Sequence, residues 1–160
     1  MGWGQPESEL ASVVQRADKL GIQAIILFGV SHHKDAEGLD TCKSDGLMAR
    51  MIKIAKAAGV TLAILSNELD LFYGSGFRDK LPFLKDFDLI VDATYTEVLK
   101  PDPRAYAFIT DGLGMAAEDC VFVDDQDRNI QGAVAIGMQT VHFDVMEPAA
   151  SYQTALSLLL

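Results

Sequence analysis

Short apolar runs of strand length alternate with longer amphipathic stretches along this chain, and this alternation most constrains the fold. Five runs have the length of strands: residues 22–29, 60–66, 87–92, 120–125 and 139–145. The first is apolar on both faces, as in a strand buried on both sides. Strands that alternate with helices predict a parallel sheet with right-handed crossovers and helices on both faces. About five strands favour an open doubly wound sheet over a closed eight-fold barrel.

Helices are expected between these runs. Asp102 can cap a helix that begins at Pro103, because proline fits the first helical position. The other expected helices cover residues 7–21, 45–59 and 126–137, with a final helix at 148–160 and short helices with loops at 67–84.

Length and charge limit what the chain can do. Its 160 residues, 49% of them apolar and 22% charged, are typical of one globular domain over residues 1–160. The formal net charge of −10 argues against partners such as nucleic acids and anionic membranes. We expect a cytoplasmic protein, since the sequence shows neither a signal segment nor a run of about 20 apolar residues. Cys42 and Cys120 do not form a disulfide framework, and we expect a buried thiol at Cys120.

Polar residues follow several of the apolar runs, where the ends of parallel strands meet at one edge of a sheet. The candidates there are Ser31, His32, Ser66, Asn67, Asp92, Asp124 and Asp125. The adjacent pair Asp124 and Asp125 is the most specific signal, because two carboxylates repel unless a cation or a proton lies between them. Oxygen ligands of this kind suit Mg²⁺. The alternative is one capping aspartate beside a solvated one.

Two further residues suggest an anion site. The hydroxyl of Ser66, together with backbone N–H groups at a helix start, can hold a phosphate, although an ordinary helix cap is the alternative. Lys100 can neutralise a phosphoryl group, although a solvated lysine is the alternative.

Taken together, "LAILSN", "LKPDPRAY" and "CVFVDDQDRNIQGAVAIGMQTVHFD" closely resemble the second, third and fourth motifs of the haloacid dehalogenase (HAD) superfamily of hydrolases. The resemblance covers about residues 56–145. It implies a three-layer, Rossmann-like α/β fold with strand order 3-2-1-4-5. It also implies that Ser66, Asn67 and Lys100 bind the transferred phosphate group and that Asp124 and Asp125 serve Mg²⁺.

The first motif of that superfamily is missing. Its members place an aspartate nucleophile at the end of the first strand, and the phosphatases add an acid/base aspartate two positions later. Here, within "IILFGVSHH", the nucleophile position falls on Gly29 and the acid/base position on Ser31. No catalytic residue is therefore assigned.

The segment "LGIQAIILFGVSHHKDAEGLDTCKSDGLMARMI" is similar instead to a piece of 5-aminolevulinate dehydratase (porphobilinogen synthase), an eight-fold α/β barrel. That family has a strand ending in "LFGV", a "KDxxGS"-like loop and a "DGLxxRxI" helix, and here Leu39 replaces the usual small polar residue. The resemblance covers about residues 7–54 and stops before the lysines and cysteines of the barrel chemistry. It implies a recombined or engineered chimera, with a barrel-derived segment at about 1–54 and a HAD core at about 55–160.

Three functional hypotheses follow from these observations. The favoured one is a folded HAD-like scaffold without efficient catalysis that binds Mg²⁺, or a small phosphorylated or anionic ligand, weakly. The alternative is an active phosphatase-like or dehalogenase-like hydrolase that uses Ser31, His32 or a metal-bound water as a substitute. A third is a binding module that forms homo-oligomers. His32 and His33 are interpreted as inherited loop residues and His142 as structural.

Overall fold

The structure of the chain is a computed structural model that describes residues 23–27, 47–70, 76, 79, 82–147, 150–151 and 153–154. The helix expected at 7–21 and most of the expected tail helix lie outside these residues. So do Cys42 and the positions Gly29, Ser31, His32 and His33, on which the missing first motif depends.

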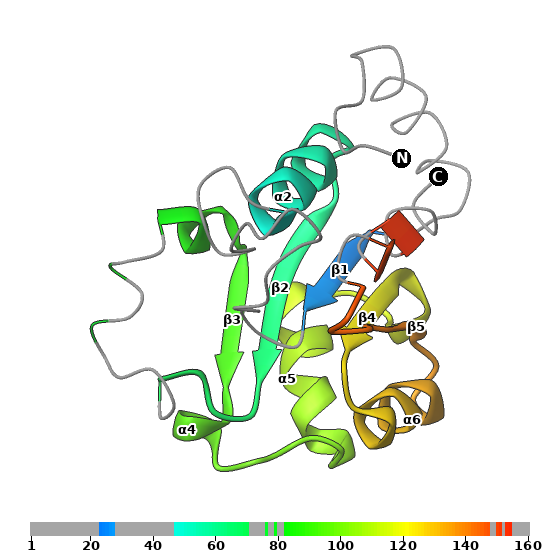
Figure 1. The fold of residues 1–160 in the computed structure, drawn as a ribbon. Coiled ribbons are helices and arrows are strands. Elements are labelled where there is room, and N and C mark those ends of the chain that lie inside the picture. The colour runs from blue at the N-terminus through cyan, green and yellow to red at the C-terminus, as the bar shows by residue number, and fades with distance from the viewer. Residues whose placement is uncertain are drawn as a thin grey trace.

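Five parallel strands form one sheet in the order β3-β2-β1-β4-β5. The strands are β1 (Ala24–Leu27), β2 (Thr61–Ser66), β3 (Leu89–Asp92), β4 (Cys120–Asp124) and β5 (Gln139–His142). β1 occupies the centre, where Ile26 pairs with Ala63 of β2 and with Phe122 of β4. This arrangement confirms the predicted strand order (Figure 1).

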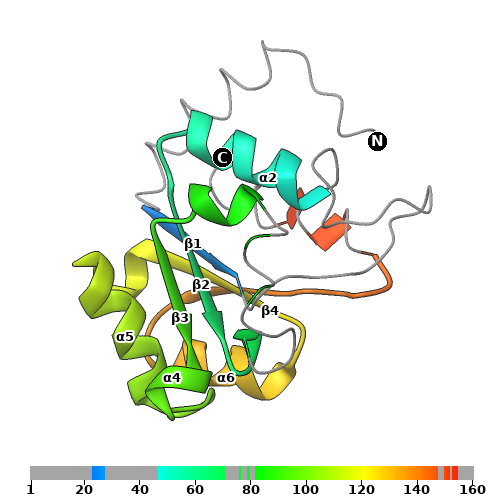
Figure 2. The ribbon, with the colours of Figure 1, turned by 90° about the vertical axis from the view of Figure 1, so that its left-hand side faces the viewer.

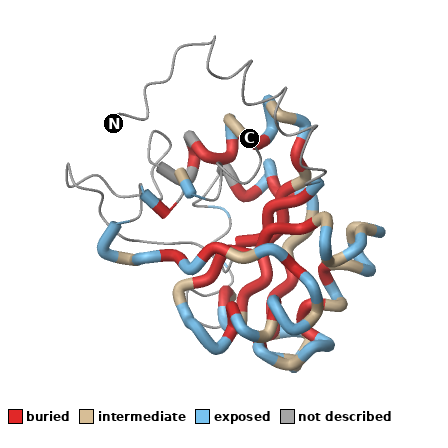
Figure 3. The backbone as a smooth tube through the Cα atoms, turned by 90° about the vertical axis from the view of Figure 1, so that its right-hand side faces the viewer, coloured by how far each residue is buried: buried red, intermediate tan, exposed pale blue. Residues whose placement is uncertain are grey.

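Helices cover both faces of the sheet (Figure 2). Successive side chains of a strand point to opposite faces, so the apolar residues of β1 need a helix on each side to bury them. On one face, α2 (Leu47–Ala57) packs against β2 and shares a core cluster with Ile25 and Leu27 of β1. On the other face, α5 (Pro103–Leu113) and α6 (Asp127–Ala135) share a core cluster with Ala24 and Ile26. A central strand buried on both sides therefore separates two apolar cores. Figure 3 shows buried positions concentrated in the strands and exposed positions in the segments around them.

The ends of several elements differ from the expected ones. β3 begins at Leu89, two residues later than predicted, because Phe87 and Asp88 precede the ladder. β5 ends at His142 rather than at residue 145, since its pairing with β4 stops where Asp124 ends that strand. α6 covers residues 127–135 within the expected 126–137. A short α4 (Ala93–Thr96), which the sequence pattern did not predict, follows β3 directly.

The predicted helix start at Asp102 is confirmed. The Asp102 side chain accepts a hydrogen bond from the Arg104 N–H at 2.9 Å, and Pro103 occupies the first helical position. The Arg104 guanidinium also pairs with this carboxylate at 2.7 Å and lowers the pKa of Asp102 to about 2. Cys120 lies fully buried in β4, and burial raises its pKa to about 11. The expected buried thiol is therefore confirmed.

Candidate functional site

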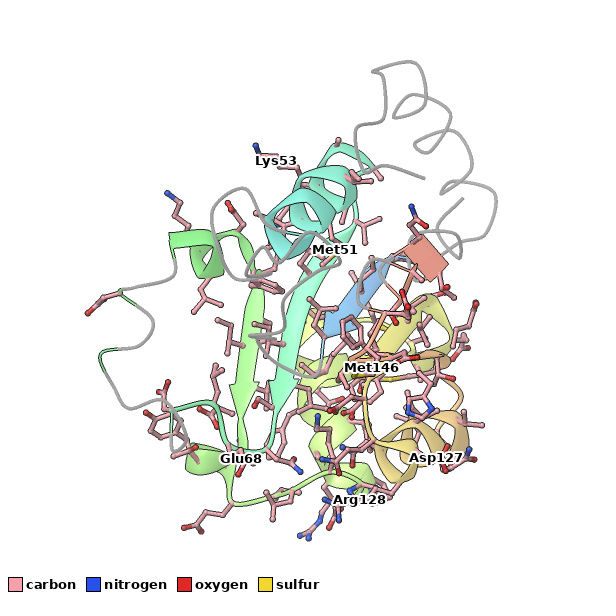
Figure 4. All side chains as sticks on the ribbon, viewed as in Figure 1. Met51, Lys53, Glu68, Asp127, Arg128 and Met146 are labelled. Carbon is pink, nitrogen blue, oxygen red and sulfur yellow. The ribbon has the colours of Figure 1, made fainter. Side chains whose placement is uncertain are left out.

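The candidate residues gather at the carboxyl edge of the sheet. Ser66 ends β2 and Asp124 ends β4, two strands that flank β1. Figure 4 shows Glu68 and Arg128, which follow these strands, at the same end of the molecule, with Lys53 of α2 at the opposite end. The topology thus brings together residues that are 58 positions apart in the sequence (124 minus 66).

A buried ion pair forms the centre of this site. The Lys100 Nζ lies 2.7 Å from Asp124 Oδ2, and the two side chains are only 3% and 1% exposed. The same ammonium lies 5.3 Å from the ring centroid of Phe122, within range of a cation–π contact. Burial lowers the pKa of Lys100, and the neighbouring Asp124 carboxylate offsets part of this effect. Lys100 is therefore held by the fold and is not the solvated lysine of the alternative interpretation.

The Asp124 carboxylate has two further partners. Its Oδ1 accepts from the Gln126 N–H at 2.8 Å, and its Oδ2 accepts from Asn129 Nδ2 at 3.1 Å. Asn129 is itself buried, and its Oδ1 has no hydrogen-bond partner in the described part of the chain. A buried acceptor without a donor is unfavourable unless water or a cation reaches it. The Asn129 side chain thus carries an unused oxygen beside the acidic pair.

Asp125 is more exposed than its neighbour Asp124. Its side chain is partly buried, and its pKa is raised by burial first and by the charge of Asp124 second. The backbone oxygen of Asp125 lies 2.9 Å from the ring nitrogen Nε2 of His142. This contact between β5 and the end of β4 agrees with the structural role expected for His142. The acidic pair therefore consists of one buried carboxylate that is paired with a lysine and one partly exposed carboxyl group whose pKa is raised.

The residues at the end of β2 form hydrogen bonds within the protein. Ser66 is buried, and its Oγ accepts from the Glu68 N–H at 3.4 Å. Asn67 directs its side chain to the backbone of Lys100, where Oδ1 accepts from the N–H at 2.8 Å and Nδ2 donates to the carbonyl at 3.3 Å. Contacts of Ser66 and Asn67 with a phosphate stay predictions.

Asp92, another candidate from the sequence, has a structural role. Its buried carboxylate accepts from the Thr94 N–H and so caps α4. It also accepts from the N–H groups of Leu69 at 3.2 Å and Asp70 at 2.8 Å, which ties the turn after β2 to the end of β3. Asp92 therefore organises the edge of the sheet on which the site lies.

Sequence reasoning missed a second layer behind the ion pair. The buried Tyr106 of α5 donates through its hydroxyl to the backbone oxygen of Asn129 at 2.7 Å. The Tyr106 ring meets Phe122 edge-on, with centroids 5.4 Å apart. Gly132 of α6 lies against Tyr106 and Pro101, so closely that an added Cβ would come within 2.6 Å of the Tyr106 hydroxyl. The available signal was the pair Asn129 and Gly132 inside a predicted helix, both poor helix formers.

This close approach predicts a loss of stability for Gly132→Ala. The new Cβ would lie 2.9 Å from the Pro101 Cβ and 3.2 Å from the Pro101 carbonyl, neither of which can rotate away. We expect the free energy of unfolding to fall by about 1–3 kcal/mol, despite the better helix propensity of alanine. Urea denaturation measures the change.

Gly112→Ala is the matched control for that variant. This glycine also lies in a helix with an added Cβ 2.7 Å from a neighbour, but the neighbour is the end of the flexible, partly exposed Leu89 side chain. We expect Gly112→Ala to change stability by less than about 1 kcal/mol. Equal losses in both variants would contradict the packing argument.

Two absences concern the described residues alone. Within the described ranges, no helix is long and apolar enough to cross a membrane. The same ranges contain no cluster of three or more His, Cys, Asp or Glu side chains that could hold a metal ion. Asp124 and Asp125 are two carboxylates and fall short of such a cluster.

Comparison with known proteins identifies the family. A sequence profile of the haloacid dehalogenase-like hydrolases matches residues 3–137, which is most of the chain. The chain therefore belongs to the haloacid dehalogenase-like hydrolase family. This finding confirms the family resemblance of the motifs and agrees with the observed sheet.

Two curated relatives reflect the two resemblances. The chain is 35% identical to (S)-2-haloacid dehalogenase 1 of Pseudomonas sp. over 101 residues, which cover 62% of this chain and 44% of that protein. It is 39% identical to delta-aminolevulinic acid dehydratase of Escherichia coli over 62 residues, which cover 39% of this chain and 19% of that enzyme. The chain thus spans less than half of the length of either relative.

Two solved structures share the fold. An uncharacterized protein of Corynebacterium glutamicum superimposes with a TM-score of 0.63 at 24% identity, over 86% of this chain and 95% of that one. A HAD family enzyme of Bacteroides thetaiotaomicron, solved as an aspartate-to-alanine mutant with magnesium and inorganic phosphate, gives a TM-score of 0.54 at 18% identity, over 62% and 53% of the two chains. At these identities the likeness shows the fold alone.

Proposed function

We propose that this chain is a HAD-family hydrolase scaffold that binds Mg²⁺ and a phosphate-like anion weakly, without efficient turnover. The observation that carries the proposal is the buried ion pair of Lys100 and Asp124 at the carboxyl edge of the sheet. Removing two charges from water costs free energy that their attraction often only offsets. A buried ion pair at this place therefore favours a role in the site over a role in stability alone. The sequence offers no aspartate at Gly29, the position where the family places its nucleophile.

The donor set suits a hard cation. Asp124 and Asp125 offer carboxylate oxygens. The Oδ1 of Asn129, which has no partner among the described residues, lies on a side chain that contacts Asp124. Oxygen donors of this kind are those that Mg²⁺ accepts, usually together with several waters and a phosphate. When bound, Mg²⁺ would supply positive charge that neutralises the anion. A cation beside Asp125 would also relieve the repulsion that raises the pKa of that carboxyl group.

The anion would bind through groups of this chain. The Lys100 ammonium has three N–H donors, so bonding to Asp124 leaves donors that can serve an anion. Ser66 adds a hydroxyl at the end of β2. Without a nucleophile, these groups can hold and orient a phosphate but cannot accept a phosphoryl group.

We further propose that the segment of about residues 7–54 derives from a barrel enzyme. The 39% identity to the dehydratase supports this origin. A strand such as β1, fully buried on both faces, is what barrels and doubly wound sheets have in common. The family profile matches from residue 3 and so includes this segment. A barrel-derived helix and strand in this place would therefore still have to fit the family's sequence pattern.

Calorimetric titration with inorganic phosphate in the presence of Mg²⁺ tests the proposed binding. We expect the wild-type protein to bind with a dissociation constant on the order of 1 mM or tighter. Lys100→Met should weaken phosphate binding about tenfold or more, because a charge-assisted hydrogen bond is lost. Lys56→Met is the control, since Lys56 lies in an exposed pair with Asp88 away from the site. No binding to the wild-type protein, or equal binding to both variants, would contradict the proposal.

An active hydrolase with a substitute nucleophile is the second candidate, and the intact Lys100–Asp124 pair is the observation that favours it. It predicts metal-dependent hydrolysis that disappears in the double variant Ser31→Ala/His32→Ala. Activity that survives both substitutions would rule out these two residues as nucleophiles.

A further inference from the structure

The Asn67 side chain is hydrogen-bonded to the backbone of Lys100. Its Oδ1 accepts from the backbone N–H of Lys100 at 2.8 Å, and its Nδ2 donates to the backbone carbonyl of the same residue at 3.3 Å. The two residues are 33 positions apart. The amide thus bonds to both backbone groups of one residue, as a neighbouring strand would.

Lys100 needs such a partner because it lies outside the helices and strands. It sits in the segment between α4 and α5, where no strand ladder orders its backbone. The Asp102 N–H bonds to the Leu99 carbonyl at 3.0 Å and forms a turn around it. From this irregular backbone the Lys100 side chain extends to Asp124 on β4. A shift of the Lys100 Cα would therefore displace the ammonium from Asp124.

We propose that Asn67 is a positioning residue, which fixes the Lys100 backbone so that the ammonium meets Asp124 and the anion site. The importance of this position for ligand binding rests on the proposed function. The contact itself explains why an amide suits this place. One planar group must present an acceptor and a donor side by side to an N–H and a C=O. An aspartate would keep the acceptor but would set a carboxylate oxygen against the Lys100 carbonyl.

The test uses the whole chain with Asn67→Ala and Asn67→Asp. Two measurements need no ligand: hydrogen exchange of the Lys100 amide, and the ¹H–¹⁵N signal of the Lys100 ammonium at a fixed pH of about 7. The ammonium signal is assigned by its absence in Lys100→Met. A buried, hydrogen-bonded ammonium exchanges its protons with water slowly enough to be seen, whereas an exposed one does not. We expect the Lys100 amide to exchange about tenfold faster or more in Asn67→Ala, which removes its acceptor. We expect the ammonium signal to be lost in both variants, because each removes the donor to the Lys100 carbonyl.

Asp88→Ala is the matched control. Asp88 also joins distant segments through its side chain, by accepting from the Leu62 N–H at 2.9 Å and from Lys56 at 2.8 Å. Its loss should change stability but leave the Lys100 ammonium signal in place. This comparison separates positioning of Lys100 from a general loosening of the fold.

The outcomes separate this inference from the proposed function. An unchanged ammonium signal and unchanged amide exchange in a folded Asn67 variant would overturn the positioning role. A fall in phosphate affinity with both Lys100 signals unchanged would also overturn it and would make Asn67 a ligand of the anion. Loss of the signals in a protein whose wild type binds no phosphate would support the positioning role and sink only the proposed function. Two variants are used so that one that fails to fold does not decide the result.

Discussion

Replacing Lys100 by methionine is expected to lower the free energy of unfolding by about 3–5 kcal/mol, because Asp124 is left buried without its cation. The Asp124 side chain is 1% exposed, so bulk water solvates its carboxylate poorly once the ammonium is removed. Its two remaining donors, the Gln126 N–H and Asn129 Nδ2, favour the lower end of this range. Urea denaturation at neutral pH, followed by circular dichroism, measures the loss.

Two variants show whether burial is the cause. Lys56→Met breaks the ion pair with Asp88, whose N···O distance of 2.8 Å is close to the 2.7 Å of the buried pair. The Lys56 and Asp88 side chains, however, are 38% and 44% exposed. Its loss should be below about 1 kcal/mol, because exposed pairs are screened by water. The double variant Lys100→Met/Asp124→Leu should recover much of the stability, because it leaves no unpaired charge. A loss in Lys100→Met no larger than in Lys56→Met would show that the buried pair is not held as described.

The second large effect is a gain of activity. Introducing aspartates at Gly29 and Ser31 together is expected to raise the Mg²⁺-dependent hydrolysis of p-nitrophenyl phosphate by about 1,000-fold or more over the wild type. β1 lies between β2 and β4, and Leu27 pairs with Val123, the residue before Asp124. The sequence places Gly29 two residues after Leu27. An aspartate there would supply the nucleophile that the family uses.

Its controls test the chemistry directly. The double variant Gly29→Asn/Ser31→Asn has the same shape but no carboxylates, and we expect it to stay inactive. Adding Asp124→Asn to the active variant should abolish the gain, since one of the two carboxylates proposed to hold the metal would be lost. A gain in the asparagine variant, or no gain in the aspartate variant, would refute the idea that only the first motif is missing.

The sheet and the candidate site were predictable because both depend on local patterns. Short apolar runs between amphipathic stretches predicted the number of strands, and polar residues at their ends marked Ser66 and Asp124. Element ends were less predictable, because Phe87 and Asp88 look like strand residues but lie outside the ladder. The four-residue α4 is too short to give a helical period. The strand ends depend on pairing with the neighbouring strand, which the local pattern does not show.

Contacts between distant segments were not predictable from the pattern. Nothing in "LSNE" indicates that the Asn67 amide bonds to a backbone 33 residues away. The Tyr106 hydroxyl likewise reaches the Asn129 carbonyl only because α5 and α6 lie on the same face of the sheet. Asp92 looked like a site residue from its place at a strand end, yet its carboxylate is bonded to backbone N–H groups. Such roles depend on tertiary packing.

The rate of p-nitrophenyl phosphate hydrolysis by the purified wild-type chain with Mg²⁺ tests the central claim most directly. The claim is that a HAD-type site built on Lys100 and Asp124 lacks its nucleophile. The account predicts a rate at the level of the blank, unchanged by Asp124→Asn. A turnover of the order of 1 s⁻¹ or above, abolished by Asp124→Asn, would contradict it.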